Sequence, residues 1–285
     1  MEVLLTRLGG ATAGATVTGP LGDPVTAGFG LIEDGGTAIV EVAQAGGLSL
    51  VGTASPASAC DATTRGTGEL ILAAAATGAE VVLVCAGGSA STDCGAGAIA
   101  AIEEAGGLPP GVRLVVLCDV RTPFEEAATT FAPQKGADAR TVRTLAARLD
   151  RFAAALPRDP RGTPMTGAAG GLAGGLWARY DATLVAGATF VLEALDFDRR
   201  MRAAWCVVTG EGRLDPTTLE GKVCGEVATR ARQAGVPAHA ICGQLAIDPF
   251  SVRILDLQVL LAASTVAELE GAGRELGERL LARTA

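Results

Sequence analysis

Several residue types are scarce in this chain of 285 residues, and each scarcity argues against a class of function. His239 is the only histidine, so imidazole-based zinc sites and Ser–His–Asp triads are all but excluded. No uninterrupted apolar run reaches the roughly 18 residues that a membrane span needs. Residues 1–8 lack the basic segment and long apolar core of a secretion signal. We therefore expect a cytoplasmic protein that does not bind membranes.

Positive charge is also scarce. The net charge is −8 and the pI is about 4.8, with no cluster of Lys and Arg to neutralise a phosphate backbone. Nucleic acid is therefore not an expected partner. Any anionic small molecule must be held locally, by backbone N–H groups or by single basic residues.

Familiar cysteine and nucleotide motifs are missing too. The seven cysteines show no CxxC spacing and lie mostly in apolar or Gly-rich runs, which indicates buried free thiols in a reducing compartment. No segment fits GxGxxG with an acidic residue about 20 positions later, and none fits GxxxxGK[ST]. Neither a Rossmann fingerprint nor a P-loop is therefore present.

What the chain has in abundance is small residues. It is 49% hydrophobic, largely through Ala and Val, and contains 39 glycines. Small side chains allow helices to lie close to sheets, and glycines allow tight turns between strands and helices. This composition favours the α/β class.

The order of patterns along the chain predicts two domains. Short β-rich runs over residues 15–42, separated by Pro, Gly and Asp turns, indicate a three-stranded antiparallel meander. Helix and strand patterns alternate from there, and those after residue 205 predict a parallel sheet. Residues 157–164, with three prolines, are the best linker candidate. We expect one domain over residues 1–157, containing the meander, and a second over residues 158–285.

Four Gly-rich segments stand at or near the predicted ends of strands. Glycine allows backbone N–H groups to approach an anion, and a following helix N-terminus adds a favourable dipole. A plain connection is the alternative for each segment alone, so the signal comes from the set. The segments cover residues 63–69, 86–97, 167–175 and 209–215.

Carboxylates and single basic residues accompany these segments. Asp93, Glu211 and Asp215 lie inside them, and Asp119 closes a predicted strand, where ligands bind in open α/β sheets. One or two such carboxylates could hold Mg²⁺ against phosphates, although helix capping is the competing interpretation. The candidate anion ligands are Arg65, Lys135 and Lys222.

Eight ordered blocks resemble the type I, two-domain glycerate kinase family. They cover nearly the whole chain, and their order makes the resemblance specific. The blocks are Val17–Gly22, Thr67–Ile71, Gly87–Ala90, Asp93 with Gly95–Gly97, Cys118–Val120, Pro133–Ala137, Gly167–Leu172 and Thr209–Asp215, the last followed by Thr218–Leu219 and Gly221–Lys222.

The resemblance implies a flavodoxin-like parallel-sheet domain into which an α/β domain with a mixed sheet is inserted. It also implies ATP- and Mg²⁺-dependent phosphoryl transfer to D-glycerate, giving phosphoglycerate. On this basis the catalytic candidates are Asp93, Glu211 and Asp215, and the metal candidates are Asp119 and Asp215. The expected ligands of substrate and phosphate are Arg65, Gly87, Gly88, Ser89, Lys135, Gly170, Gly171, Gly210, Gly212, Arg213 and Lys222.

The chain departs from the family pattern most at its start. The family opens with an Asp-Ser-Phe-Lys-Gly segment and an Asp-Gly-Gly-Glu-Gly-Thr segment, and neither occurs here. We therefore expect a flavodoxin-like domain without its first strands, with an exposed sheet edge that could lead to a homodimer. A non-catalytic remnant that still binds an anion is the first alternative. A reductase that uses the Gly-rich loops for a dinucleotide is the second.

Overall fold

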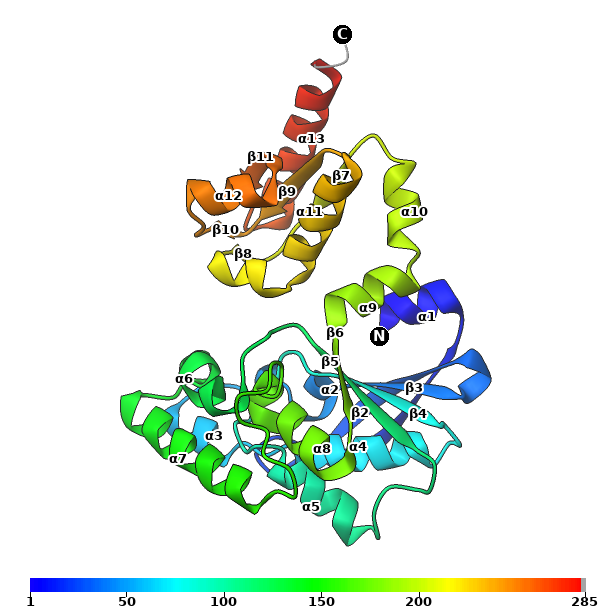
Figure 1. Ribbon diagram of the computed structural model, residues 1–285, viewed down its shortest axis with the longest axis vertical. Coiled ribbons are helices and arrows are strands. Elements are labelled where there is room, and N and C mark those ends of the chain that lie inside the picture. The colour runs from blue at the N-terminus through cyan, green and yellow to red at the C-terminus, as the bar shows by residue number, and fades with distance from the viewer. Residues whose placement is uncertain (283–285) are drawn as a thin grey trace. The chain divides into compact units, whose positions relative to one another are not determined.

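A computed structural model describes residues 1–282, which belong to two compact units divided after Phe190. Unit 1 runs from Met1 to Phe190 and unit 2 begins at Val191 (Figure 1). Within residues 1–282, no helix combines the length and apolar character needed to cross a membrane. Each unit is described by itself.

Unit 1 is built on a six-stranded mixed sheet, whose strands follow one another in chain order. The first three pair antiparallel, as the predicted meander requires, and β3 to β6 are parallel. The continuous apolar runs of β4 and β5 are typical of strands covered on both faces. The strands are β1 (Ala11–Thr18), β2 (Pro24–Ile32), β3 (Thr37–Glu41), β4 (Val81–Cys85), β5 (Arg113–Cys118) and β6 (Thr183–Ala186).

Helices cover this sheet closely because small residues line the contacts. A Cβ added to Gly66 would lie 1.8 Å from the carbonyl oxygen of Thr18, so only glycine allows α4 to approach β1 this closely. Helices α4 and α8 contact the sheet, and α5 lies against both (Figure 1). The longer helices of unit 1 are α1 (Glu2–Leu8), α3 (Pro56–Asp61), α4 (Arg65–Ala75), α5 (Ala96–Glu104), α7 (Ala139–Ala155) and α8 (Leu172–Tyr180).

Short helical turns shape the loops of unit 1. Helix α6 and the 3-10 turns η3 and η4 follow β5, and η5 leads into α8. Phe124, Leu145 and Leu149 are fully buried in a second cluster between α6 and α7. These elements are α2 (Val42–Gly46), α6 (Ala127–Phe131), η1 (Glu33–Gly35), η2 (Leu48–Leu50), η3 (Phe124–Glu126), η4 (Pro133–Lys135) and η5 (Ala168–Gly171); α9 (Gly187–Ala194) spans the division between the units.

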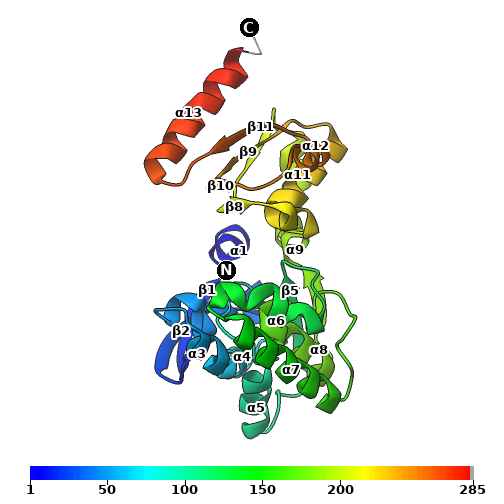
Figure 2. The same ribbon diagram turned by 90° about the vertical axis from the view of Figure 1, so that its left-hand side faces the viewer.

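Unit 2 contains a three-stranded parallel sheet in the order β11-β9-β7. Helix α11 contacts β7, β9 and α12, whereas α13 contacts β11 and β9 from the opposite face (Figure 2). The elements are α10 (Phe197–Arg202), β7 (Val207–Thr209), β8 (Arg213–Leu214), η6 (Pro216–Glu220), α11 (Val223–Ala234), β9 (Ala238–Cys242), β10 (Gln244–Leu245), α12 (Pro249–Leu255), β11 (Leu257–Ala262) and α13 (Val266–Ala282).

The α/β class with a mixed sheet in one unit and a parallel sheet in the other is confirmed. The division falls after Phe190 instead of at residue 157, because β6 pairs with β5 and α8 contacts the sheet of unit 1. Residues 157–164 form a loop between α7 and α8 inside unit 1. Helix α1 and strand β6 were not expected from the sequence.

Candidate functional site

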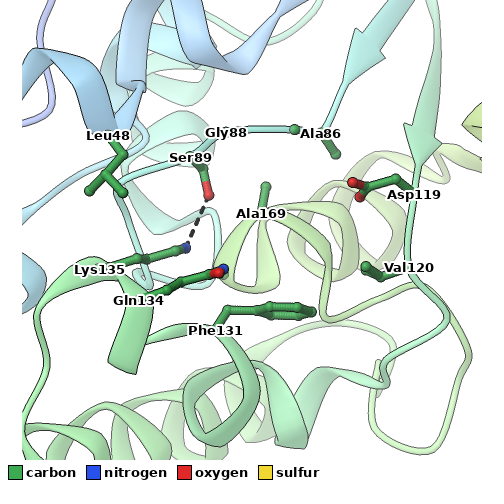
Figure 3. Close-up of a pocket in the computed structure, with 12 residues that line it drawn as sticks. Leu48, Ala86, Gly88, Ser89, Asp119, Val120, Phe131, Gln134, Lys135 and Ala169 are labelled. Carbon is green, nitrogen blue, oxygen red and sulfur yellow. Dashed lines mark hydrogen bonds between the residues drawn. The ribbon is translucent and has the colours of Figure 1, made fainter. Parts of the chain in front are cut away.

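A pocket of about 340 Å³ opens in unit 1 at the carboxyl ends of β4 and β5. This is the edge of a parallel sheet at which α/β proteins bind ligands. Figure 3 shows its polar side chains converging from different loops. The lining residues are Leu48, Ala86, Gly87, Gly88, Ser89, Asp119, Val120, Phe131, Gln134, Lys135, Ala169 and Gly170.

The loop after β4 presents backbone donors to this pocket. Within residues 1–282, the N–H groups of Gly87, Gly88 and Ser89 donate to no backbone or side-chain acceptor. Gly88 has a φ of 70°, a left-handed conformation that glycine adopts without strain. Consecutive free N–H groups can together bind an anion.

Lys135 adds a buried positive charge to the same end of the pocket. Its side chain is nine-tenths buried or more, and its Nζ donates to Ser89 Oγ at 3.1 Å and to the Ser91 carbonyl at 2.5 Å. Burial lowers the pKa of Lys135 to about 8, and the charge of Asp93 opposes this shift only in part. Because Ser89 Oγ accepts from the ammonium, its own hydroxyl proton can be donated to a ligand.

Asp119 provides the acceptor of the pocket. It follows the last residue of β5 and is exposed, and within residues 1–282 its carboxylate has no hydrogen-bond or ion-pair partner. Figure 3 shows the Asp119 carboxylate and the Lys135 ammonium pointing inward from opposite sides. The pocket is therefore polarised, with the Lys135 ammonium on one side and the Asp119 carboxylate on the other.

The Gly-rich turn before α8 closes one wall of the pocket. Ala169, Gly170 and Gly171 have φ values of 52°, 67° and 90°, three consecutive left-handed residues. A Cβ at Gly170 would lie 2.1 Å from the carbonyl oxygen of Ser91, so no larger residue fits. Gly170 lines the pocket, whereas Gly171 caps the N-terminus of α8 behind it.

Asp93 does not line the pocket. Its Oδ2 accepts from Thr64 N and Thr64 Oγ1, both at 2.8 Å, and from Gly97 N at 3.1 Å, and its Oδ1 accepts from Gly95 N. A buried carboxylate with this many donors holds the starts of α4 and α5 together. The carboxylate of Asp93 therefore positions these two helices, and Asp93 is not one of the residues that line the pocket.

Arg65 is also placed outside the pocket. Its guanidinium pairs with Glu69 at 3.0 Å and with Glu104 at 2.6 Å, and both carboxylates raise its pKa. The sequence suggested Arg65 as an anion ligand, but these two carboxylates already compensate its positive charge. The pocket thus contains Gly87, Gly88, Ser89, Asp119, Lys135 and Gly170 of the predicted residues, without Asp93, Arg65 or Gly171.

The remaining predicted residues lie together in unit 2. Lys222 Nζ is 3.6 Å from Asp215 Oδ1 and 3.9 Å from Glu211 Oε2, and Arg213 Nε is 3.5 Å from Asp215 Oδ2. The Thr217 hydroxyl, with the charges of Lys222 and Arg213, lowers the pKa of Asp215. Asp215 also caps η6. Here two carboxylates and two cations neutralise one another.

Two glycines shape the loop that carries this cluster. A Cβ at Gly210 would lie 2.5 Å from the carbonyl oxygen of Ile241, which keeps the loop close to the end of β9. A Cβ at Gly212 would meet nothing within 4 Å. Within residues 1–282, neither unit contains a group of three or more His, Cys, Asp or Glu side chains arranged to hold a metal ion.

Sequence reasoning missed the side chains that complete the pocket of unit 1. Phe131 and Gln134 reach it from α6 and η4, and Leu48, Val120 and Ala169 add apolar wall. Val120, Gln134 and Ala169 each lie in a block that resembles the family, whereas Leu48 and Phe131 lie outside those blocks.

Comparisons with known proteins point to one family. The model of the glycerate kinase family matches residues 1–106 and 107–284. Glycerate kinase of Bacillus subtilis (strain 168) is 38% identical, over 88% of this chain and 75% of the relative. Glycerate 2-kinase of Escherichia coli (strain K12) is 35% identical, over 87% and 74%.

A solved structure gives the same result. The crystal structure of a protein assigned as glycerate kinase 2 from Salmonella typhimurium LT2 superposes with a TM-score of 0.69 and 31% identity. The match covers 92% of this chain and 77% of that one. With the family model matched over almost every residue, this chain belongs to the glycerate kinase family.

Proposed function

We propose that this chain transfers a phosphoryl group from ATP to D-glycerate, giving phosphoglycerate. The observation that carries the proposal is the polarised pocket of unit 1, whose free N–H groups and buried Lys135 face an unpaired Asp119. A small hydroxy acid offers matching chemistry, with a carboxylate for the donors and a hydroxyl for the carboxylate. Phosphoryl transfer depends mainly on such positioning and charge neutralisation.

The donor end is the proposed site of the glycerate carboxylate. Gly87, Gly88 and Ser89 would donate backbone hydrogen bonds, and Lys135 would supply the neutralising charge. Hydrogen bonds to charged groups are the stronger class, and burial strengthens them further. Ser89 would be held as a donor because its oxygen is already bonded to Lys135.

Asp119 is the proposed partner of the reacting hydroxyl. It can orient that hydroxyl and accept its proton, which is the role of a general base. Its carboxylate is also the best fit for Mg²⁺, since it lacks any partner within residues 1–282 and that ion often takes only one or two protein carboxylates. When bound, Mg²⁺ supplies neutralisation of phosphate charge.

The charged loop of unit 2 is a second proposed set. Lys222 and Arg213 could exchange carboxylate partners for phosphate oxygens of ATP, with Gly210 and Gly212 leaving the backbone accessible. Glu211 and Asp215 could then take part in metal binding or proton transfer. Asp215→Asn tests this role, with an expected fall in kcat of about 10² and no loss of folding.

The family pattern extends the proposal to the architecture. We assign unit 1 to the inserted domain and unit 2 to the C-terminal part of the flavodoxin-like domain. The seven free thiols support a reducing, cytoplasmic location. Edge strand β7, where Val208 is 51% exposed, supports pairing of two copies, and light scattering would measure that pairing.

The decisive experiment is a coupled assay of ATP-dependent phosphorylation of D-glycerate by the purified chain. Turnover whose KM for glycerate rises in Lys135→Met would establish the activity and exclude a contaminating kinase. The non-catalytic remnant is not favoured by relatives 35–38% identical over most of the chain. It would gain support if the chain bound glycerate without turnover. Binding of NADPH in place of ATP would instead support a reductase.

A further inference from the structure

The polar groups of the pocket differ in what they can bond. The N–H groups of Gly87 to Ser89 and the ammonium of Lys135 only donate, and the ionised carboxylate of Asp119 only accepts. The Ser89 hydroxyl oxygen already accepts from Lys135, which leaves that hydroxyl as a donor. Gln134 is the one lining side chain with an amide, which both donates and accepts. We infer that Gln134 recognises the hydroxyl group of the acceptor that does not receive the phosphoryl group. This inference rests on the proposed function.

The backbone of Gln134 is held rigidly. It is the middle residue of η4, where Lys135 N donates to Ala132 O at 3.0 Å and Gly136 N donates to Pro133 O at 3.1 Å. Gly136 has a φ of 96°, and a Cβ there would lie 2.4 Å from Ser55 N. The turn is therefore fixed against the neighbouring chain, and a side chain on it has a defined origin.

The neighbouring Lys135 fixes the turn on its other side. Its two hydrogen bonds to Ser89 and Ser91 tie η4 to the loop that carries the free N–H groups. Gln134 is therefore positioned relative to the proposed carboxylate site, because both are connected through Lys135. Figure 3 shows its amide extending into the pocket above the Phe131 ring.

The amide is also available to a ligand. Within residues 1–282 the side chain of Gln134 has no hydrogen-bond partner, and Gln134 is exposed. Figure 3 shows the aromatic ring of Phe131 beside it, and this ring offers no strong competing donor or acceptor. A hydroxyl group can donate to the amide oxygen or accept from its nitrogen.

The groups of a dihydroxy acid match the pocket one to one. Its carboxylate suits the donor end and its reacting hydroxyl suits Asp119, which leaves a second hydroxyl without a charged partner. With Ser89 assigned to the carboxylate, Gln134 is the remaining polar side chain of the lining. A site built to hydrogen-bond a substrate hydroxyl discriminates strongly against an analogue that lacks it, because its polar group is left unpaired. Gln134 thus selects dihydroxy over monohydroxy acids.

The test compares three acids on Gln134→Leu, which keeps the bulk of the side chain and removes its hydrogen bonds. D-lactate lacks the 3-hydroxyl of glycerate, and 3-hydroxypropanoate lacks the 2-hydroxyl. The hydroxyl that is phosphorylated is first identified from the product of the wild-type chain by NMR. Dissociation constants for the three acids are then measured by titration calorimetry, so turnover of the analogues is not needed.

We expect Gln134→Leu to weaken binding of glycerate by about tenfold to a hundredfold, and of the analogue that keeps the non-reacting hydroxyl by a similar factor. Binding of the analogue that keeps only the reacting hydroxyl should change less than about twofold. Equal losses for all three acids, or no loss for glycerate, would overturn the inference. Gln233→Leu, on the exposed side of α11, is the matched control and should change none of the three.

A second variant keeps the test valid if leucine disturbs the turn. Gln134→Asn retains the amide on a shorter side chain, and should weaken glycerate binding while sparing the same analogue. Thermal unfolding of both variants checks that the fold is retained. If the wild-type chain binds glycerate but never phosphorylates it, the proposed function fails. Gln134 still binds one hydroxyl of the ligand if Gln134→Leu then weakens the binding of glycerate and of only one of the two monohydroxy acids, and equal losses for all three acids still overturn that role.

Discussion

The candidate charged residues of the two units differ in whether they are paired with an opposite charge. In unit 1, Lys135 bonds only to neutral groups and Asp119 has no partner within residues 1–282. In unit 2, Lys222 and Arg213 lie within ion-pair distance of Asp215, and Lys222 also of Glu211. Unpaired charges favour a ligand directly, whereas paired charges must exchange partners first. The pocket of unit 1 is therefore the more preorganised of the two candidate sets.

The units also differ in how they cover apolar surface. Unit 1 buries a large core around its six-stranded sheet, while most of the exposed large apolar side chains belong to unit 2. Trp205 is 83% exposed and Phe250 is 72% exposed. Unit 2 therefore leaves more of its large apolar side chains exposed than unit 1 does.

The largest expected effect is on Asp119. Asp119→Asn removes the only free carboxylate of the pocket and should lower kcat by about 10² or more, with little change in stability because the residue is exposed. Steady-state kinetics with D-glycerate measures this. If Asp119→Asn turned over normally while Asp215→Asn did not, the acceptor of the proton would have to be sought in unit 2.

Substitution of the two lysines should weaken substrate binding to different extents. Lys→Met at either position should weaken substrate binding by about 1.5–3 kcal/mol, with Lys135 at the upper end because it is buried and Lys222 at the lower end. KM values for glycerate and ATP, measured for both variants, separate the roles. Unchanged KM values in both variants would mean that neither lysine takes part in substrate binding.

A pair of glycines tests the difference in local packing. Gly170→Ala places a methyl group against Ser91 O in a left-handed conformation and should reduce the free energy of unfolding by about 1–3 kcal/mol. Gly212→Ala has open space and should change it by about 0.5 kcal/mol or less. Urea unfolding followed by circular dichroism gives both values. Equal losses would mean that the turn before α8 tolerates a side chain.

The smallest expected effect is a pH dependence. Burial lowers the pKa of Lys135 to about 8, so its ammonium is charged below that pH and loses its proton as the pH rises through it. The KM for glycerate should therefore increase by about threefold to tenfold between pH 7.5 and 9. Lys135→Met should show no such increase. A wild-type KM that stays constant over this range would contradict an anion-binding role for the ammonium.

Local patterns made most elements predictable. The apolar runs of β4 and β5 and the apolar spacing within α7 and α11 depend on neighbouring residues only, so local sequence is enough to indicate these four elements. The division between units was not predictable in this way. It depends on β6 pairing with β5, a long-range contact that the short segment Thr183–Ala186 does not reveal.

The candidate site shows the same limit of local reasoning. Glycines after a strand indicated the loop Gly87–Ser89, and the end of a strand indicated Asp119, which both line the pocket. Asp93 looked catalytic because it stands in that Gly-rich segment, yet its partners include Thr64, far away in the sequence. Phe131 carries no sequence signal, because its contact with the pocket depends on how α6 folds back.

The hydrogen bonds of the Asp93 carboxylate link the local unfolding of the N-termini of α4 and α5. It accepts the amides of Thr64, Gly95 and Gly97, so the starts of α4 and α5 share one acceptor. Neither helix can fray from its N-terminus without disturbing the other. In hydrogen–deuterium exchange these three amides should therefore behave as a single cooperative unit, with one opening rate, even though they belong to two different helices. The loop between β4 and α5, which lines the pocket, would open and close together with these three amides.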